Sequence, residues 1–175
     1  SKEYYNNNNK LLSLSLLSIF EINMMFSNLC LNVFNQCISD YHIQNSINEK
    51  PKNPFKKDDI IHLLYQKSWT DTVQWHLEDL IRDPKINPVD ALKLKRTIDL
   101  SNQKRTDLVE DIDSYFLDKY KNVEASNTAT FNSESPAWAI DRLSILALKI
   151  FHMDEETKRK GANNEHINNC SSKLE

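Results

Sequence analysis

Residues 58–82 read DDIIHLLYQKSWTDTVQWHLEDLIR, and this stretch decides the fold. When it is drawn as a helix, large apolar residues occur on nearly all sides: Ile60, Ile61, Leu63, Leu64, Tyr65, Trp69, Val73, Trp75, Leu77, Leu80 and Ile81. A helix that is apolar all round lies at the centre of its bundle. Pro84 ends the pattern, because the residue before a proline avoids the helical conformation. The stretch therefore predicts a central helix that other helices surround.

Further segments supply the surrounding helices. Apolar residues recur at helical spacing over about 24–41. The pairs Asn87–Pro88 and Ser135–Pro136 each combine an N-capping side chain with a proline at the first helical position. They predict helices that run to about residues 121 and 159, and 163–175 begins one more. We therefore expect an all-α fold, an antiparallel helical bundle.

Composition bounds both the fold and the function. The chain has 175 residues, a formal net charge of −3 and one glycine. That length suits one domain. The charge lacks the basic excess that nucleic-acid binding requires, so no nucleic-acid partner is expected. A single glycine is too few for phosphate-cradling loops and for the turns of a compact β-protein. Three cysteines without zinc-site spacing indicate free thiols in a reducing compartment, and we predict a cytoplasmic location.

The N-terminal stretch is expected to lie outside the domain. Its apolar run LLSLSLLSIF (11–20) ends at Glu21, before a bilayer-spanning length and without a small-residue cleavage site. We therefore expect no membrane segment. Met24 and Met25 open a new segment, MMFSNLC. We predict an extension over 1–23, disordered or non-native, and a single helical domain over 24–175.

Charged residues on the central helix mark a candidate site. Asp71, Trp75, Glu78 and Arg82 share one of its faces at 100° per residue. Charges on a central helix must be paired or bound to something, because burying them alone is costly. An internal pair between Glu78 and Arg82 would satisfy them, and a ligand site would do so as well. The candidate ligand-binding residues on this helix are Trp75, His76, Glu78, Asp79 and Arg82.

Two further helices carry similar charged strips. The helix after Pro88 presents Lys95, Asp99, Asn102 and Arg105, of which Asn102 and Arg105 interrupt its apolar stripe. The helix after Pro136 presents Asp141 and Arg142 within WAIDRLSILALKIFHM. These strips are either solvated edges or the walls of a common cleft. We expect them to converge into a charged internal cleft, and all six residues join the candidate ligand-binding set.

Four acids suggest a divalent-ion site, but their spacing argues against it. Glu78 and Asp79 lie near the end of one helix, whereas Glu110 and Asp113 lie far along the next. Glu110 is about 33 Å beyond Pro88 at 1.5 Å per residue, so the acids are not level in a hairpin. The histidines have no partner at metal-ligand spacing. We therefore predict no metal site, and leave the cofactors unknown.

Five segments carry a family resemblance: FSNLCLNVFNQCISDYH (26–42), NPF with LLYQKSW (53–69), WHLEDLIRDP (75–84), LKLKRTIDLSNQKRTDLVEDIDSYF (92–116) and ESPAWAIDRLSILALKIFHM (134–153). Together they resemble the bacterial family called domain of unknown function 4254. The resemblance implies a cytoplasmic bacterial protein without established activity. It also implies further C-terminal helices, so we expect the bundle here to lack its last helices. The acids are partly similar to those of all-helical nucleoside triphosphate pyrophosphatases, but Arg82 stands where a third acid is expected.

Three functions remain open from the sequence. The first is binding of a small anionic or zwitterionic ligand in the charged cleft. The second is a non-enzymatic scaffold or interaction protein whose charges form structural salt bridges. The third is metal-dependent hydrolysis of a phosphate ester or nucleotide. Carboxylates that converge without arginines between them would favour the hydrolase, and one-to-one acid–arginine pairing would favour the scaffold. Whether the protein is an enzyme, and its oligomeric state, stay open.

Overall fold

The computed structural model describes residues 25–174, and the extension expected at 1–23 lies outside them. A helix occupies residues 25–44. Four helices follow: α2 (Ile60–Ile81), α3 (Pro88–Tyr120), α4 (Pro136–Lys158) and α5 (Asn164–Leu174). No strand occurs within the described residues, and the helices pack as a bundle. The all-α prediction is confirmed.

Local capping explains where the helices begin. The side chain of Asn87 accepts a hydrogen bond from the backbone N–H of Val89, and Pro88 opens α3. The side chain of Ser135 accepts one from Trp138, and Pro136 opens α4. At α2 the cap is Asp59. These side chains satisfy backbone donors that the first helical turn leaves without partners.

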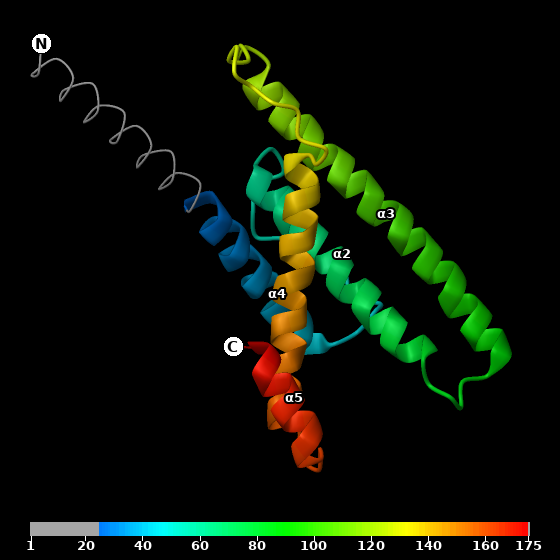
Figure 1. The fold of residues 1–175 in the computed structure, drawn as a ribbon. Helices are drawn as coiled ribbons and strands as arrows, with labels where there is room; N and C mark the ends of the chain where they lie inside the picture. The colour runs from blue at the N-terminus through cyan, green and yellow to red at the C-terminus, as the bar shows by residue number, and fades with distance from the viewer. Residues whose placement is uncertain (1–24, 175) are drawn as a thin grey trace, which may run out of the picture.

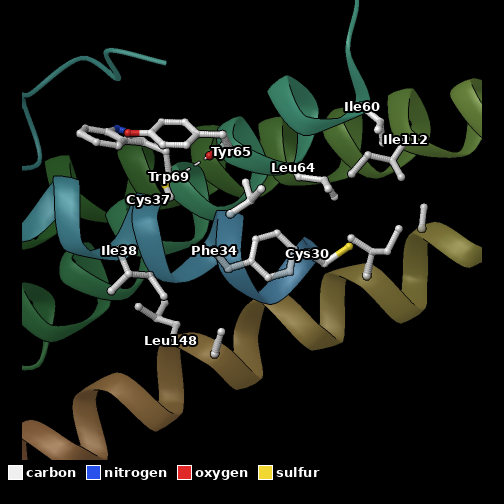
Figure 2. Close-up of a cluster of buried hydrophobic side chains, with 14 of the residues drawn as sticks. Cys30, Phe34, Cys37, Ile38, Ile60, Leu64, Tyr65, Trp69, Ile112 and Leu148 are labelled. Atoms are coloured by element: carbon white, nitrogen blue, oxygen red, sulfur yellow. Dashed lines mark hydrogen bonds between the residues drawn. The ribbon is translucent and has the colours of Figure 1, made fainter. Parts of the chain in front are cut away.

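The helix at 25–44, α3 and α4 pack around α2, whose apolar sequence predicted a central position. Figure 1 shows α2 and α3 as an antiparallel pair joined by a short loop, with α4 crossing α2 and α5 folding back on α4. The helix at 25–44 packs against α2 and α4 through a shared core, which Figure 2 shows with Phe34, Leu64 and Leu148 among its members. None of the described helices combines the length and the hydropathy that crossing a bilayer requires.

The middle of α2 is polar but buried. Its buried polar residues are Lys67, Ser68, Thr70, Asp71, Thr72 and Gln74. Lys67 and Ser68 come just before the buried Trp69, and the other four lie between Trp69 and the buried Leu77, so together they form a buried polar band. A polar group shielded from water must find a partner within the protein. The partners of this band define the candidate site.

Candidate functional site

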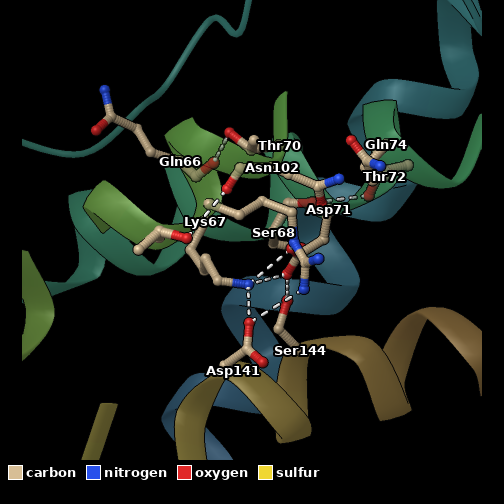
Figure 3. Close-up of polar contacts among 12 residues, drawn as sticks. Gln66, Lys67, Ser68, Thr70, Asp71, Thr72, Gln74, Asn102, Asp141 and Ser144 are labelled. Carbon is tan, nitrogen blue, oxygen red and sulfur yellow. Dashed lines mark hydrogen bonds and ion pairs between the residues drawn. The ribbon is translucent and has the colours of Figure 1, made fainter. Parts of the chain in front are cut away.

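A lysine without solvent exposure lies at the centre of the site. Lys67 is 0% exposed, and its Nζ lies 2.5 Å from Oδ2 of Asp71, four residues later on α2. The same Nζ lies 2.6 Å from Oδ1 of Asp141 on α4. Figure 3 shows the ammonium group between the two carboxylates. Lys67 therefore joins α2 to α4 through charge-assisted hydrogen bonds, which are stronger than neutral ones.

Arg105 brings α3 into the same cluster. Its Nε lies 2.7 Å from Oδ1 of Asp71, and its Nη2 lies 3.3 Å from Oδ1 of Asp141. Oγ of Ser144 on α4 donates a 2.6 Å hydrogen bond to Oδ2 of Asp71. Burial alone would lower the pKa of Arg105, but the two aspartates raise it above its ordinary value. The guanidinium therefore stays charged. We call Lys67, Asp71, Arg105, Asp141 and Ser144 the charge network.

The charge network partly matches the sequence prediction. Arg105 and Asp141 were predicted to converge on α2 from neighbouring helices, and the structure places them within hydrogen-bond distance of it. Asp71 was placed on the charged face but outside the candidate set. Lys67 and Ser144 were missed. The available signal for Lys67 was its position four residues before Asp71, on a helix that is otherwise apolar on all sides.

A cavity of about 250 Å³ adjoins the charge network, and we call it the arginine cavity. It is lined by Asp71, Gln74, Trp75, Glu78, Arg82, Asn102, Arg105 and Ile145. Arg82 does not pair with the Glu78 carboxylate, which the sequence left as one alternative. Its Nη2 instead lies 2.9 Å from Oδ1 of Asp79, and its Nε donates to the backbone carbonyl of Glu78 at 2.8 Å. Oε1 of Glu78 accepts from Nε2 of Gln74 at 3.2 Å.

A second cavity, of about 330 Å³, lies between the helix at 25–44, α2 and α4. We call it the histidine cavity, and its lining is Tyr41, His42, Asn45, Thr72, Trp75, His76, Asp79, Leu80, His152 and Glu155. Burial raises the pKa of Tyr41 to about 12, so its hydroxyl stays protonated, and it shares a 2.7 Å hydrogen bond with Nδ1 of His76. The indole of Trp75 lines both cavities and stacks on the ring of His152, at 5.0 Å between centroids. Burial lowers the pKa of His152.

Some predicted site residues lie away from these features. Lys95 and Asp99 are exposed on α3 and bind each other as an i,i+4 pair. Arg142 pairs with Glu134 and is exposed. Because these side chains are satisfied on the surface, the structure does not bring them to the charge network or to either cavity.

The four acids considered as a divalent-ion site do not form one cluster. Glu110 is exposed, and Oδ1 of Asp113 accepts a 3.2 Å hydrogen bond from the backbone N–H of Ala137 at the start of α4. Across the part of the chain that the structure describes, no group of three metal-ligating side chains contains Glu78, Asp79, Glu110 or Asp113. The arrangement gives no support to a magnesium site on these acids.

The fold and its buried charges define an all-helical domain whose charged groups pair across three helices. The chain belongs to the family described as protein of unknown function (DUF4254), whose sequence model matches residues 61–175. The match covers α2 to α5, and so it includes the whole charge network. No curated protein and no solved structure matches the chain.

Proposed function

We propose that this chain is a non-enzymatic scaffold or interaction domain, in which the charge network fixes the arrangement of α2, α3 and α4. The observation that carries the proposal is the balance of the network. Two cations, Lys67 and Arg105, meet two carboxylates, Asp71 and Asp141, and each cation contacts both carboxylates. The pairing is shared and not one-to-one, but the two cations and two carboxylates neutralise one another, which favours a structural role over catalysis.

The hydrogen-bond donors of Lys67 are all used within the charge network, so none is left to bind a substrate. Nζ of Lys67 has three donors, and its three short contacts are to Asp71 Oδ1, Asp71 Oδ2 and Asp141 Oδ1. A catalytic base or an anion clamp needs a charge that the protein itself does not neutralise. Burying charges is costly unless they are paired and hydrogen-bonded. Pairing across three helices also disfavours other packings, because a shifted helix would leave a buried charge alone.

Exposed apolar side chains on α4 support a role in binding a protein partner. Trp138, Leu146 and Ile150 are 53%, 51% and 48% exposed. Their spacings of eight and four residues place them on one side of the helix. A row of large exposed apolar side chains on one helix side is typical of a contact surface. This row supports the interaction role, while the charge network holds the helix that presents it.

Binding of a small anion is the second candidate, and the arginine cavity favours it. Arg82 and Arg105 both line this cavity beside Asn102 and the indole of Trp75. Guanidinium groups suit carboxylate and phosphate ligands because they offer forked donors. Against this candidate, Asp71 and Glu78 line the same cavity, and so its charges are balanced. The hydrolase alternative has less support, because the acids that would hold its metal ions do not gather.

Calorimetric titration with inorganic phosphate and with ATP separates the two candidates. The scaffold proposal predicts no saturable heat with either probe and no shift in melting temperature. Saturable binding that Arg82→Gln abolishes, and that Lys95→Gln leaves intact, would establish the anion site instead. Lys95 is the matched control because it is an exposed cation outside the cavity.

A further inference from the structure

Two histidines and a glutamate meet at the histidine cavity. His42 comes from the helix at 25–44, and His152 and Glu155 come from α4. Each of the three can offer one ligand atom such that the atoms lie within 4.8 Å of one another. It is the only such group of three among residues 25–174. The sequence analysis predicted no metal site, because His42 and His152 have no short spacing that would reveal their proximity.

The hydrogen bonds of both rings leave a nitrogen lone pair available. Nδ1 of His42 donates to the carbonyl oxygen of Ile38 at 2.7 Å, so Nε2 of the neutral ring carries a lone pair. Nδ1 of His152 lies 3.0 Å from Oε2 of Glu155. A carboxylate accepts, so the proton is on Nδ1 and the lone pair of the neutral ring is on Nε2. That nitrogen is buried and has no hydrogen-bond partner among the described residues.

A buried acceptor without a donor is costly, and a metal ion would satisfy it. Metal-bound histidines usually donate their other ring nitrogen to a carbonyl or a carboxylate, which fixes the ring orientation. Here His42 donates to a carbonyl oxygen and His152 donates to a carboxylate, the two kinds of partner seen at such sites. Neighbouring rings hold the two imidazoles in place: Trp75 stacks on His152, and the ring of Phe151 lies 4.4 Å from that of His42.

We propose that His42, His152 and Glu155 form a binding site for a divalent transition-metal ion, of which Zn²⁺ is the best fit. Two imidazole nitrogens and one carboxylate oxygen are a donor set that Zn²⁺ takes, whereas Mg²⁺ and Ca²⁺ prefer oxygen ligands alone. Bonds of about 2.0 Å in a tetrahedral site place ligand atoms about 3.3 Å apart. Glu155 is exposed, and to bind the ion its carboxylate would give up the hydrogen bond to Nδ1 of His152. The fourth position faces the histidine cavity and would hold water or a small ligand.

The site is separate from the charge network, so it goes beyond the structural role proposed above. Asp79 and His76 line the same cavity, but Asp79 pairs with Arg82 and His76 bonds to Tyr41. They are therefore neighbours of the proposed ion and not part of its ligand set. His76 in consequence offers a control variant within the same cavity.

Calorimetric titration of the metal-free chain with ZnCl₂ tests the proposal. We expect one ion per chain with saturable heat. His42→Gln and His152→Gln should abolish it, and Glu155→Gln should weaken it about tenfold or more, since a neutral amide replaces the carboxylate ligand. His76→Gln should leave the affinity unchanged. Because Glu155 is exposed, its variant also tests the site if a histidine variant fails to fold.

Titration with Co²⁺ identifies the ligands independently. Nitrogen and oxygen ligands give weak visible bands, whereas a cysteine thiolate adds an intense near-ultraviolet charge-transfer band. We expect the visible bands alone. A thiolate band would place the ion near Cys170 and His166, whose Sγ and Nε2 lie 3.7 Å apart, and would overturn the proposal. Absence of saturable Zn²⁺ binding, or binding that survives both His42→Gln and His152→Gln, would also overturn it.

Discussion

Ser144 on α4 donates a 2.6 Å hydrogen bond to the carboxylate of Asp71 on α2, although 73 residues separate the two in the chain. Both residues are buried, and Ser144 is 1% exposed. Asp71 also contacts Lys67 and Arg105, so this hydroxyl completes the set of donors around one carboxylate. The hydrogen bond therefore couples α2 to α4. A shift of either helix would leave the buried carboxylate of Asp71 short of a donor.

Removing the Ser144 hydroxyl should lower the free energy of unfolding by the contribution of one hydrogen bond to a charged group. We expect Ser144→Ala to reduce the free energy of unfolding by about 1.5–3 kcal/mol, because Asp71 stays buried and loses a donor. The measurement is urea denaturation followed by circular dichroism. Ser114→Ala is the matched control on an exposed position of α3, with an expected change within about 0.5 kcal/mol. Equal effects of the two variants would contradict the role given to Ser144.

Removing the arginine should cost more. Arg105→Ala leaves Lys67 alone with two carboxylates, and breaking a buried ion pair costs about 3–5 kcal/mol. The guanidinium is 25% exposed, so we expect a loss near the lower limit, about 3 kcal/mol. Lys95→Ala removes an exposed pair on the same helix and should cost under about 1 kcal/mol. The same denaturation assay compares both variants, and a near-zero effect of Arg105→Ala would place this arginine in solvent.

Cys30 and Cys37 should be unreactive while the protein is folded. Burial raises the pKa of Cys30 to about 11 and raises that of Cys37 further, so neither forms a thiolate near pH 7. Because thiolates are the reactive form, labelling with iodoacetamide should be slow in buffer and fast in denaturant. Mass spectrometry of the labelled peptides checks this. Rapid labelling of Cys37 under native conditions would show that the core around it opens readily.

The start of each main helix could be predicted from the sequence because capping is local. Asn87–Pro88 and Ser135–Pro136 carry their signal within two residues, and the structure confirms α3 and α4 there. The central position of α2 followed from apolar residues on all its sides. These features depend on near neighbours and on periodicity, which a single sequence displays.

The details of the site depend on long-range packing, so they were harder to predict from the sequence. Lys67 was missed because lysine on a helix is normally solvated, and only the packing of three helices reveals its burial. Lys95 and Asp99 joined the candidate set by helical spacing, but their side of α3 is exposed. His42 and His152 lie far apart in the sequence, on different helices, so no periodic pattern connects them.

A double-mutant cycle between Lys67 and Asp141 tests the central claim most directly. Lys67→Met and Asp141→Asn should each destabilise strongly, because each leaves the charge network with an excess buried charge. The double variant leaves Arg105 paired with Asp71, so it should lose less than the sum of the two, with a coupling of about 1.5 kcal/mol or more. Additive losses, with a coupling near zero, would contradict the account that these charges form one structural unit joining α2, α3 and α4.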